Sequence, residues 1–304
     1  MALHGSPSAP AQSPELTILT DRHLTDDELL LCATKLQGYS LNLKSWVTLD
    51  VANVRDIAWN DGAFPNLMLP AKYKSLVLAF VEGQISHQHA FDDLIEGKGQ
   101  GVVMLLVGNP GTGKTLTAEA VADRVRRPLY VLSIGELGYL DDDMEKKLKS
   151  TLKLTEKWDA VLLFDECDIL LEERSSSNLE HNELVTMFLR MLEYYRGIII
   201  MTTNRVETMD RAFQSRVHLT LRYPDLDPAA KEHIWRYFVA QTQDDSASAV
   251  LTDEVYGRLA RLPMNGRQIK NTVKISMLLA AQEKQKLSIE YIDTVLQATM
   301  EMEM

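Results

Sequence analysis

The chain has 304 residues, of which 45% are hydrophobic and 25% are charged, and its formal net charge is −11. This composition is typical of a globular protein with enough apolar residues for one large domain or two unequal ones. The acidic balance argues against broad nucleic-acid binding, and no apolar run reaches the about 18 residues that a membrane-spanning helix needs.

The first segment, residues 1–25, has neither the basic nor the apolar region of a secretory signal. We therefore expect a flexible tail on an intracellular protein, cytoplasmic or nuclear, with no membrane insertion. The two cysteines, Cys32 and Cys167, lie far apart without metal-ligand spacing. They predict free thiols in a reducing compartment.

A lead-in region, residues 26–100, mixes short apolar runs with Gly and Asn. It predicts a helical turn, a strand near Trp46–Val51 and further turns. The segment from Leu69 to Ile85 then predicts a helix, because Pro70 suits the first turn of a helix.

The most specific motif of the chain is a P-loop within LLVGNPGTGKTLTAEAV, from Leu105 to Val121. An apolar run predicts a buried strand before the loop, and a helical pattern follows it. In such a loop, backbone N–H groups surround a polyphosphate, the lysine reaches the outer phosphates and the Thr hydroxyl ligates Mg²⁺. An ordinary glycine turn is the alternative. The residues predicted to bind the nucleotide here are Gly108, Asn109, Pro110, Gly111, Thr112, Gly113, Lys114, Thr115 and Leu116.

Strands and helices then alternate, which predicts an α/β fold with a parallel sheet flanked by helices. This α/β domain spans residues 101–224. From residue 225 to residue 304 the pattern is helical only, and Asp227, Thr252, Gly266 and Ser288 mark helix starts. We therefore predict a small, all-helical lid domain after the sheet domain.

Hydrolysis needs an acid that positions the metal and a group that orients water. The strand VLLFDE ends in Asp165 and Glu166, which are predicted to hold the Mg²⁺ shell and to polarise the attacking water. Both would lie at the carboxyl edge of the sheet, where the P-loop also lies. Asn204 ends the next strand and is predicted to hydrogen-bond the water or the γ-phosphate.

The P-loop, VLLFDE, TTNR and MDRAFQSR together resemble the AAA ATPases, members of the wider AAA+ class. Further segments, such as PLYVLSIGELG and NGRQIKN, resemble a group of fungal AAA-core ATPases over about Leu24 to Ile292. The resemblance implies ATP and Mg²⁺ as ligands, Asp165 as the magnesium acid, Glu166 as the catalytic glutamate and Asn204 as the γ-phosphate sensor. It also implies a homo-oligomeric ring, a hexamer, that remodels a protein partner.

The family also supplies an arginine from a neighbouring subunit. This chain has the short QSRVH in place of the common two-arginine stretch, and Arg216 takes the finger position there. Arg211 and Arg205 are alternatives, and a surface arginine remains the other interpretation of each. Arg267, in NGRQIKN, takes the position of a second sensor on the lid or else only begins a helix.

The loop after the second strand departs from the pattern of threading unfoldases. Tyr139 and Leu140 offer an aromatic and an apolar residue, but Asp141 replaces the glycine. Three successive acids would surround a pore with negative charge, or would cap the following helix. Two other functions stay open beside the remodelling ATPase: an ATP-dependent assembly switch with negligible turnover, and a nucleic-acid motor.

Overall fold

The computed structural model describes residues 25–86, 100–137, 144–172, 179–205, 210–241 and 251–300. Contacts divide the chain into two compact units, residues 1–56 and residues 57–304. The predicted tail lies outside the described residues except for Thr25, and so do Tyr139, Leu140 and Asp141 of the predicted pore loop.

The first unit contains a short helix and a β-hairpin. Thr25 and Glu28 form a reciprocal capping box at the start of α1 (Asp26–Leu30). The strands β1 (Lys35–Ser40) and β2 (Ser45–Asp50) pair antiparallel, and a 3₁₀ turn, η1 (Val51–Asn53), follows them. The strand predicted near Trp46 is therefore confirmed. Its partner β1 was not predicted, because KLQGYS alternates too weakly to be recognised as a strand.

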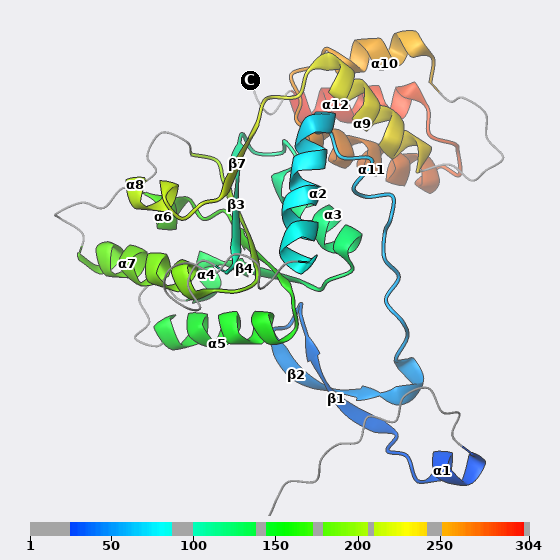
Figure 1. The fold of residues 1–304 in the computed structure, drawn as a ribbon. Coiled ribbons are helices and arrows are strands. Elements are labelled where there is room, and N and C mark those ends of the chain that lie inside the picture. Colours follow the sequence, from blue (N-terminus) through cyan, green and yellow to red (C-terminus); the bar gives the residue numbers. More distant parts are fainter. Residues whose placement is uncertain are drawn as a thin grey trace, which may run out of the picture. The chain divides into compact units, whose positions relative to one another are not determined.

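A five-stranded parallel sheet forms the centre of the second unit, in the order β4-β5-β6-β3-β7 (Figure 1). The P-loop strand β3 therefore lies between β6 and β7. Because helices cover both faces of the sheet, its central strands are almost wholly apolar, which is why they were recognisable in the sequence. The strands are β3 (Val102–Gly108), β4 (Leu129–Ser133), β5 (Val161–Asp165), β6 (Ile198–Thr203) and β7 (Leu219–Tyr223).

Two layers of helices cover the sheet. On one side lie α2 (Ala71–Ser86) and α3 (Lys114–Val125) (Figure 1). Their core includes Val81 and Met104. On the other side, Phe188 packs edge-to-face on Phe164 of β5, with ring centroids 4.9 Å apart. The helices that follow β4 and β5 are α4 (Ile134–Leu137), α5 (Met144–Lys157), α6 (Asp168–Leu171) and α7 (Leu179–Tyr194), and α8 (Arg211–Gln214) follows β6. This arrangement confirms the predicted α/β fold.

The predicted lead-in region, residues 26–100, contributes to both units. Residues 57–86 belong to the second unit, where Phe64 and Leu67 are buried in the same core as α2 and α3. This segment therefore reaches the edge of the sheet at which the P-loop lies.

Four helices follow the last strand and lie together (Figure 1). They pack around Trp235, which is fully buried. Asp227 caps the first of them by accepting a hydrogen bond from the Ala230 amide, and Asn265 forms a capping box with Gln268 at the third. These caps confirm the starts predicted at Asp227 and Gly266. The helices are α9 (Pro228–Ala240), α10 (Asp253–Ala260), α11 (Gly266–Gln282) and α12 (Ile289–Met300). Within the described part of the chain, no helix has the length and apolarity needed to cross a membrane.

Candidate functional site

A cavity of about 530 Å³ lies at the carboxyl edge of the sheet, between the sheet domain and the lid helices. We call it the P-loop cavity. Its walls come from residues 110–117, from the ends of β5 and β6, from residues 60–69 and from α9 and α11. Among the predicted site residues, Asp165, Glu166, Asn204 and Arg267 line it together with the loop.

The loop depends on glycine at two positions. Gly111 and Gly113 have φ angles of 77° and 98°, a region that other residues adopt only under strain. A Cβ on Gly111 would lie 2.5 Å from Cγ of Asn265, which caps α11. The Gly266 amide donates a 3.0 Å hydrogen bond to the Gly111 carbonyl. The same glycine therefore shapes the loop and lets the lid approach it.

Lys114 is the first residue of α3, and only 7% of it is exposed. Its ammonium donates hydrogen bonds to the carbonyl oxygens of Gly108 (2.7 Å) and Asn109 (2.8 Å), and to Oδ1 of Asn204 (2.9 Å). Burial lowers the pKa of Lys114, and the nearby carboxylate of Asp165 opposes that shift. These three acceptors are neutral, so phosphate oxygens would be stronger partners for the ammonium.

Asp165 connects the loop to two strands. Its Oδ1 accepts hydrogen bonds from the Thr115 hydroxyl (3.0 Å) and from the Thr202 hydroxyl (2.6 Å). A Thr hydroxyl and a carboxylate beside a phosphate loop are the hard oxygen donors that Mg²⁺ prefers. Among the described residues, no cluster of three or more acidic, His or Cys side chains could hold a metal alone. A magnesium ion here would therefore take its other ligands from phosphate and water.

Glu166 directly follows β5 and has a φ of 53°, in the left-handed region. Holding a residue other than glycine there costs about 1–3 kcal/mol, and such residues cluster at functional sites. The Glu166 amide donates a 2.9 Å hydrogen bond to the Thr202 hydroxyl, which helps to hold this conformation. The Glu166 side chain is exposed to the cavity beside Asp165.

Asp168 supports this edge of the sheet and was missed in the sequence. Its Oδ1 accepts hydrogen bonds from the backbone amide of Asn204 (2.9 Å) and from the Thr203 hydroxyl. Cys167 beside it is buried, its thiol donates to the Thr202 carbonyl, and burial raises its pKa. The available signal was a third carboxylate in DECD, but nothing local shows that it contacts the next strand.

Apolar residues of the cavity wall were also missed. Leu67, Met68 and Leu69 line the cavity from the segment before α2, and Ile234 and Phe238 line it from α9. These two segments carry no motif and are far apart in the sequence. Their meeting is a result of tertiary packing, and it forms a pocket suited to a flat apolar ring.

Arg267 and Lys270 line the cavity from α11, one helical turn apart. Arg267 is near enough to lower the pKa of Lys114 electrostatically, although burial is the larger cause. Arg216 is different, because it does not line the cavity of its own chain. It follows α8, where its guanidinium pairs with Glu193 of α7. Arg205 and Arg211 are exposed.

Residues 104–225 match the model of the "ATPase family associated with various cellular activities (AAA)". The chain contains an AAA ATPase domain. An uncharacterised AAA family ATPase of Sinorhizobium fredii is 34% identical over 120 residues, which are 37% of this chain and 36% of that protein. The AAA domain-containing protein FIGL1 of Arabidopsis thaliana is 26% identical over 65% of this chain and 30% of its own length.

The AAA fold extends beyond the matched range. The crystal structure of the FIGL-1 AAA domain superposes with a TM-score of 0.60 at 17% identity, covering 79% of this chain and 85% of that one. Other relatives include a 26S proteasome regulatory subunit 4 homolog of Dictyostelium discoideum, 27% identical over 67% of this chain and 48% of its own. The chain spans between a quarter and a half of the length of these curated relatives.

Proposed function

We propose that this protein binds ATP in the P-loop cavity and hydrolyses it to ADP and phosphate. One observation supports this most strongly. The P-loop lysine, the Asp165–Glu166 pair and Asn204 come from three segments, yet they line one cavity of nucleotide size. The match of residues 104–225 to a family of ATPases agrees with this proposal.

The cavity supports a division of roles. The loop amides and Lys114 would bind the β- and γ-phosphates, and apolar lining residues such as Leu69 and Phe238 would contact the adenine. Glu166 would orient a water molecule and accept its proton as the water attacks the γ-phosphorus. Asn204 would hold that water or a γ-phosphate oxygen. Thr115 and Asp165 would hold Mg²⁺, which neutralises charge on the phosphates.

We further propose that the active form is a homo-oligomeric ring, a hexamer, in which Arg216 completes the site of the neighbouring subunit. The position of Arg216 outside its own cavity supports a role in trans. Relatives with names such as 26S proteasome regulatory subunit suggest that the ring remodels a protein client. We place the chain with the fungal AAA-core ATPases that its motifs resemble.

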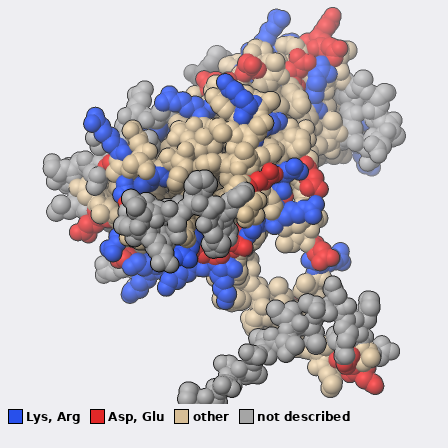
Figure 2. Space-filling view, viewed as in Figure 1, with Lys and Arg blue, Asp and Glu red and all other residues tan. Residues whose placement is uncertain are grey.

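The charge distribution supports a protein client over a nucleic acid. Figure 2 shows charges of both signs on this face, with Lys and Arg gathered along the edge where α5 lies in Figure 1. The exposed lysines of α5, such as Lys146 and Lys149, are the densest basic group on one helix, but Lys149 is paired with Glu145. The net charge of −11 acts against the attraction of phosphate backbones.

Steady-state phosphate release over a range of protein concentrations tests the proposal. ATP with Mg²⁺ should be hydrolysed, a chelator should stop the reaction, and specific activity should rise as subunits assemble. Binding of ATP with no turnover at any concentration would favour the assembly switch instead. A large stimulation by DNA or RNA would favour a nucleic-acid motor.

A further inference from the structure

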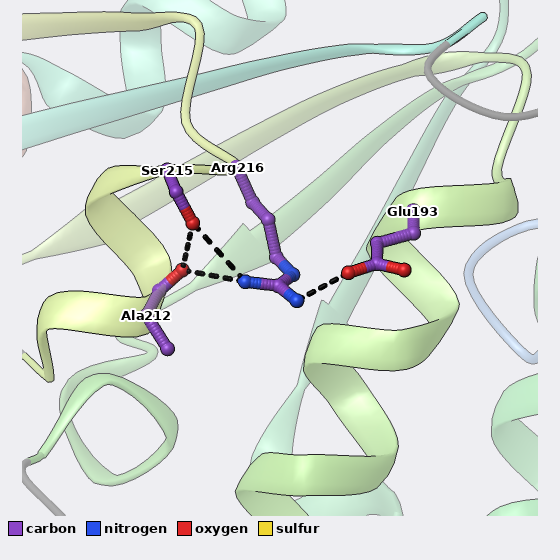
Figure 3. Close-up of polar contacts among 4 residues, drawn as sticks. All are labelled: Glu193, Ala212, Ser215 and Arg216. Carbon is purple, nitrogen blue, oxygen red and sulfur yellow. Dashed lines mark hydrogen bonds and ion pairs between the residues drawn. The ribbon is translucent and has the colours of Figure 1, made fainter. Parts of the chain in front are cut away.

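The guanidinium of Arg216 is held by its own subunit (Figure 3). Its Nη1 donates hydrogen bonds to the Ala212 carbonyl (3.0 Å) and the Ser215 hydroxyl (3.1 Å), and its Nη2 pairs with Oε1 of Glu193. The two acceptors on Nη1 belong to α8 and the residue after it, whereas Glu193 belongs to α7. Glu193 therefore provides the carboxylate that compensates the charge of this arginine.

The pair lies in a partly buried environment. The Arg216 and Glu193 side chains are 26% and 22% exposed, and Nε of Arg216 is buried with no acceptor among the described residues. A guanidinium with an unsatisfied N–H is not in its best possible site, since such a donor loses the bonds that water would supply. The arginine would gain from an anion that takes more of its five donors, as a phosphate does.

Packing joins this pair to the strand that carries Asp165. Phe188 of α7 contacts Phe164, the residue before Asp165. The ring centroids of Phe188 and of Phe213 in α8 are 6.1 Å apart. The Asp210 amide donates a 2.8 Å hydrogen bond to the Leu171 carbonyl of α6, which fixes the start of α8. Three aromatic rings therefore hold α7 and α8 against β5, so Arg216 has a defined place before any neighbour arrives.

We propose that Glu193 is a positioning residue that restrains Arg216 within its own subunit until a nucleotide phosphate of the neighbouring subunit competes for it. This inference rests on the proposed role of Arg216 as a finger in trans. Glu193 and the γ-phosphate are alternative anionic partners of one guanidinium. A ring with ATP at the interface gains the phosphate contact but loses part of the Glu193 contact, so the restraint weakens assembly.

Glu193→Gln tests the restraint, since it keeps the shape and an acceptor oxygen but removes the charge. The subunit concentration that gives half of the maximal specific ATPase activity should fall by about 1.5- to fivefold, the range expected for a partly exposed ion pair. Glu183→Gln makes the same change of charge at an exposed position of α7 and should leave that concentration unchanged. We call that concentration the midpoint. If Glu193 had only a structural role, Glu193→Gln would lower the melting temperature without shifting the midpoint toward lower concentration.

The double variant Glu193→Gln with Arg216→Ala separates the possible failures. If the restraint acts through Arg216, the double variant should have the same specific ATPase activity at each subunit concentration as Arg216→Ala alone. If Arg216→Ala alone keeps the parent turnover, the finger role fails and this inference fails with it. If Arg216→Ala is inactive but Glu193→Gln leaves the midpoint unchanged or raises it, only the restraint is overturned. Should Glu193→Gln unfold, Glu193→Asp, which keeps the charge but has a shorter reach, should also lower the midpoint, and an unchanged midpoint would overturn the restraint.

Discussion

The ammonium of Lys114 donates a 2.9 Å hydrogen bond to Oδ1 of Asn204, which joins the first turn of α3 to the end of β6. This contact connects the loop proposed to bind phosphate with the residue proposed to sense it. A phosphate oxygen that binds Lys114 would compete with the same Asn204 oxygen. Nucleotide binding would therefore release the side-chain carboxamide of Asn204 for its own contact with water or phosphate.

Replacing Lys114 with Ala should abolish most ATP binding, because the loop loses its only charged contact to the outer phosphates. Isothermal titration calorimetry measures this directly. Lys146→Ala, on the exposed face of α5, is the matched control and should bind like the parent. Micromolar affinity retained by Lys114→Ala would contradict the phosphate-loop assignment.

Glu166→Gln should separate binding from chemistry. Gln keeps the size and hydrogen bonding of the side chain but loses its basicity, so ATP should still bind while turnover falls by roughly 10²-fold or more. Affinity comes from the same titration, and turnover from phosphate release. Parent-like turnover would place the catalytic base elsewhere.

Asp168→Ala should affect catalysis indirectly, since it removes the oxygen that accepts hydrogen bonds from the Asn204 backbone amide and the Thr203 hydroxyl. We expect a loss of about 1–3 kcal/mol in the free energy of unfolding, the cost of an unsatisfied buried donor. The kcat should also fall, because Asn204 is no longer fixed. Asp168→Asn keeps one acceptor oxygen. Its free energy of unfolding, measured by denaturant titration, should lie between those of the parent and Asp168→Ala. Equal effects of the two variants would argue against this role.

Mixing two inactive variants tests whether Arg216 acts in trans. Arg216→Ala binds ATP but offers no finger, whereas Lys114→Ala offers the finger but binds no ATP. Mixed rings should therefore regain part of the activity, since such a finger contributes about 10³–10⁵ in rate in other P-loop enzymes. Arg211→Ala, at the start of the short helix α8 that precedes Arg216, is the control and should stay active alone. If light scattering shows mixed rings but activity does not return, Arg216 is not a finger in trans.

His218 predicts a pH dependence of stability. Its Nδ1 accepts a 3.1 Å hydrogen bond from the Val103 backbone amide, and partial burial of the ring lowers its pKa below the ordinary 6.5, although the residue as a whole has an exposed surface. The unfolded chain therefore binds a proton more readily, so stability is complete above about pH 6.5 and decreases as the pH falls below it. His218→Asn keeps an acceptor but does not titrate, and its melting temperature should fall less between about pH 7.5 and pH 5.5. His233→Asn controls for the loss of one imidazole. Equal slopes for the parent and His218→Asn would contradict the prediction.

Features that depend on local chemistry were predictable from the sequence. The apolar runs of β3, β5 and β6 identify buried strands because both faces of each strand are covered. The P-loop needs its glycines at fixed spacing, Asp227 marks the start of α9 by capping it, and Gly266 is the first residue of α11. A parallel sheet then brings the ends of β5 and β6 to one edge, which explains why Asp165 and Asn204 meet the loop.

Features that depend on distant packing were not predictable. The contact of Asp168 with Asn204 and the pair of Glu193 with Arg216 join segments that no local pattern relates. The apolar wall formed by Leu67 and Phe238 likewise needs the lid to lie over the loop. Such contacts depend on how helices and strands stack in three dimensions, and single-sequence periodicity carries no information about that.

The walls of the P-loop cavity have one more consequence. Residues 60–69 lie before the range matched by the AAA family model, and α9 and α11 lie after it, yet both line the same cavity. A nucleotide bound there would act as a non-covalent cross-link between the beginning, the middle and the end of the second unit. A fragment cut to residues 104–225 would keep the phosphate loop and both acids but lose this cross-link, and with it the stabilisation that a ligand gives to the state it binds.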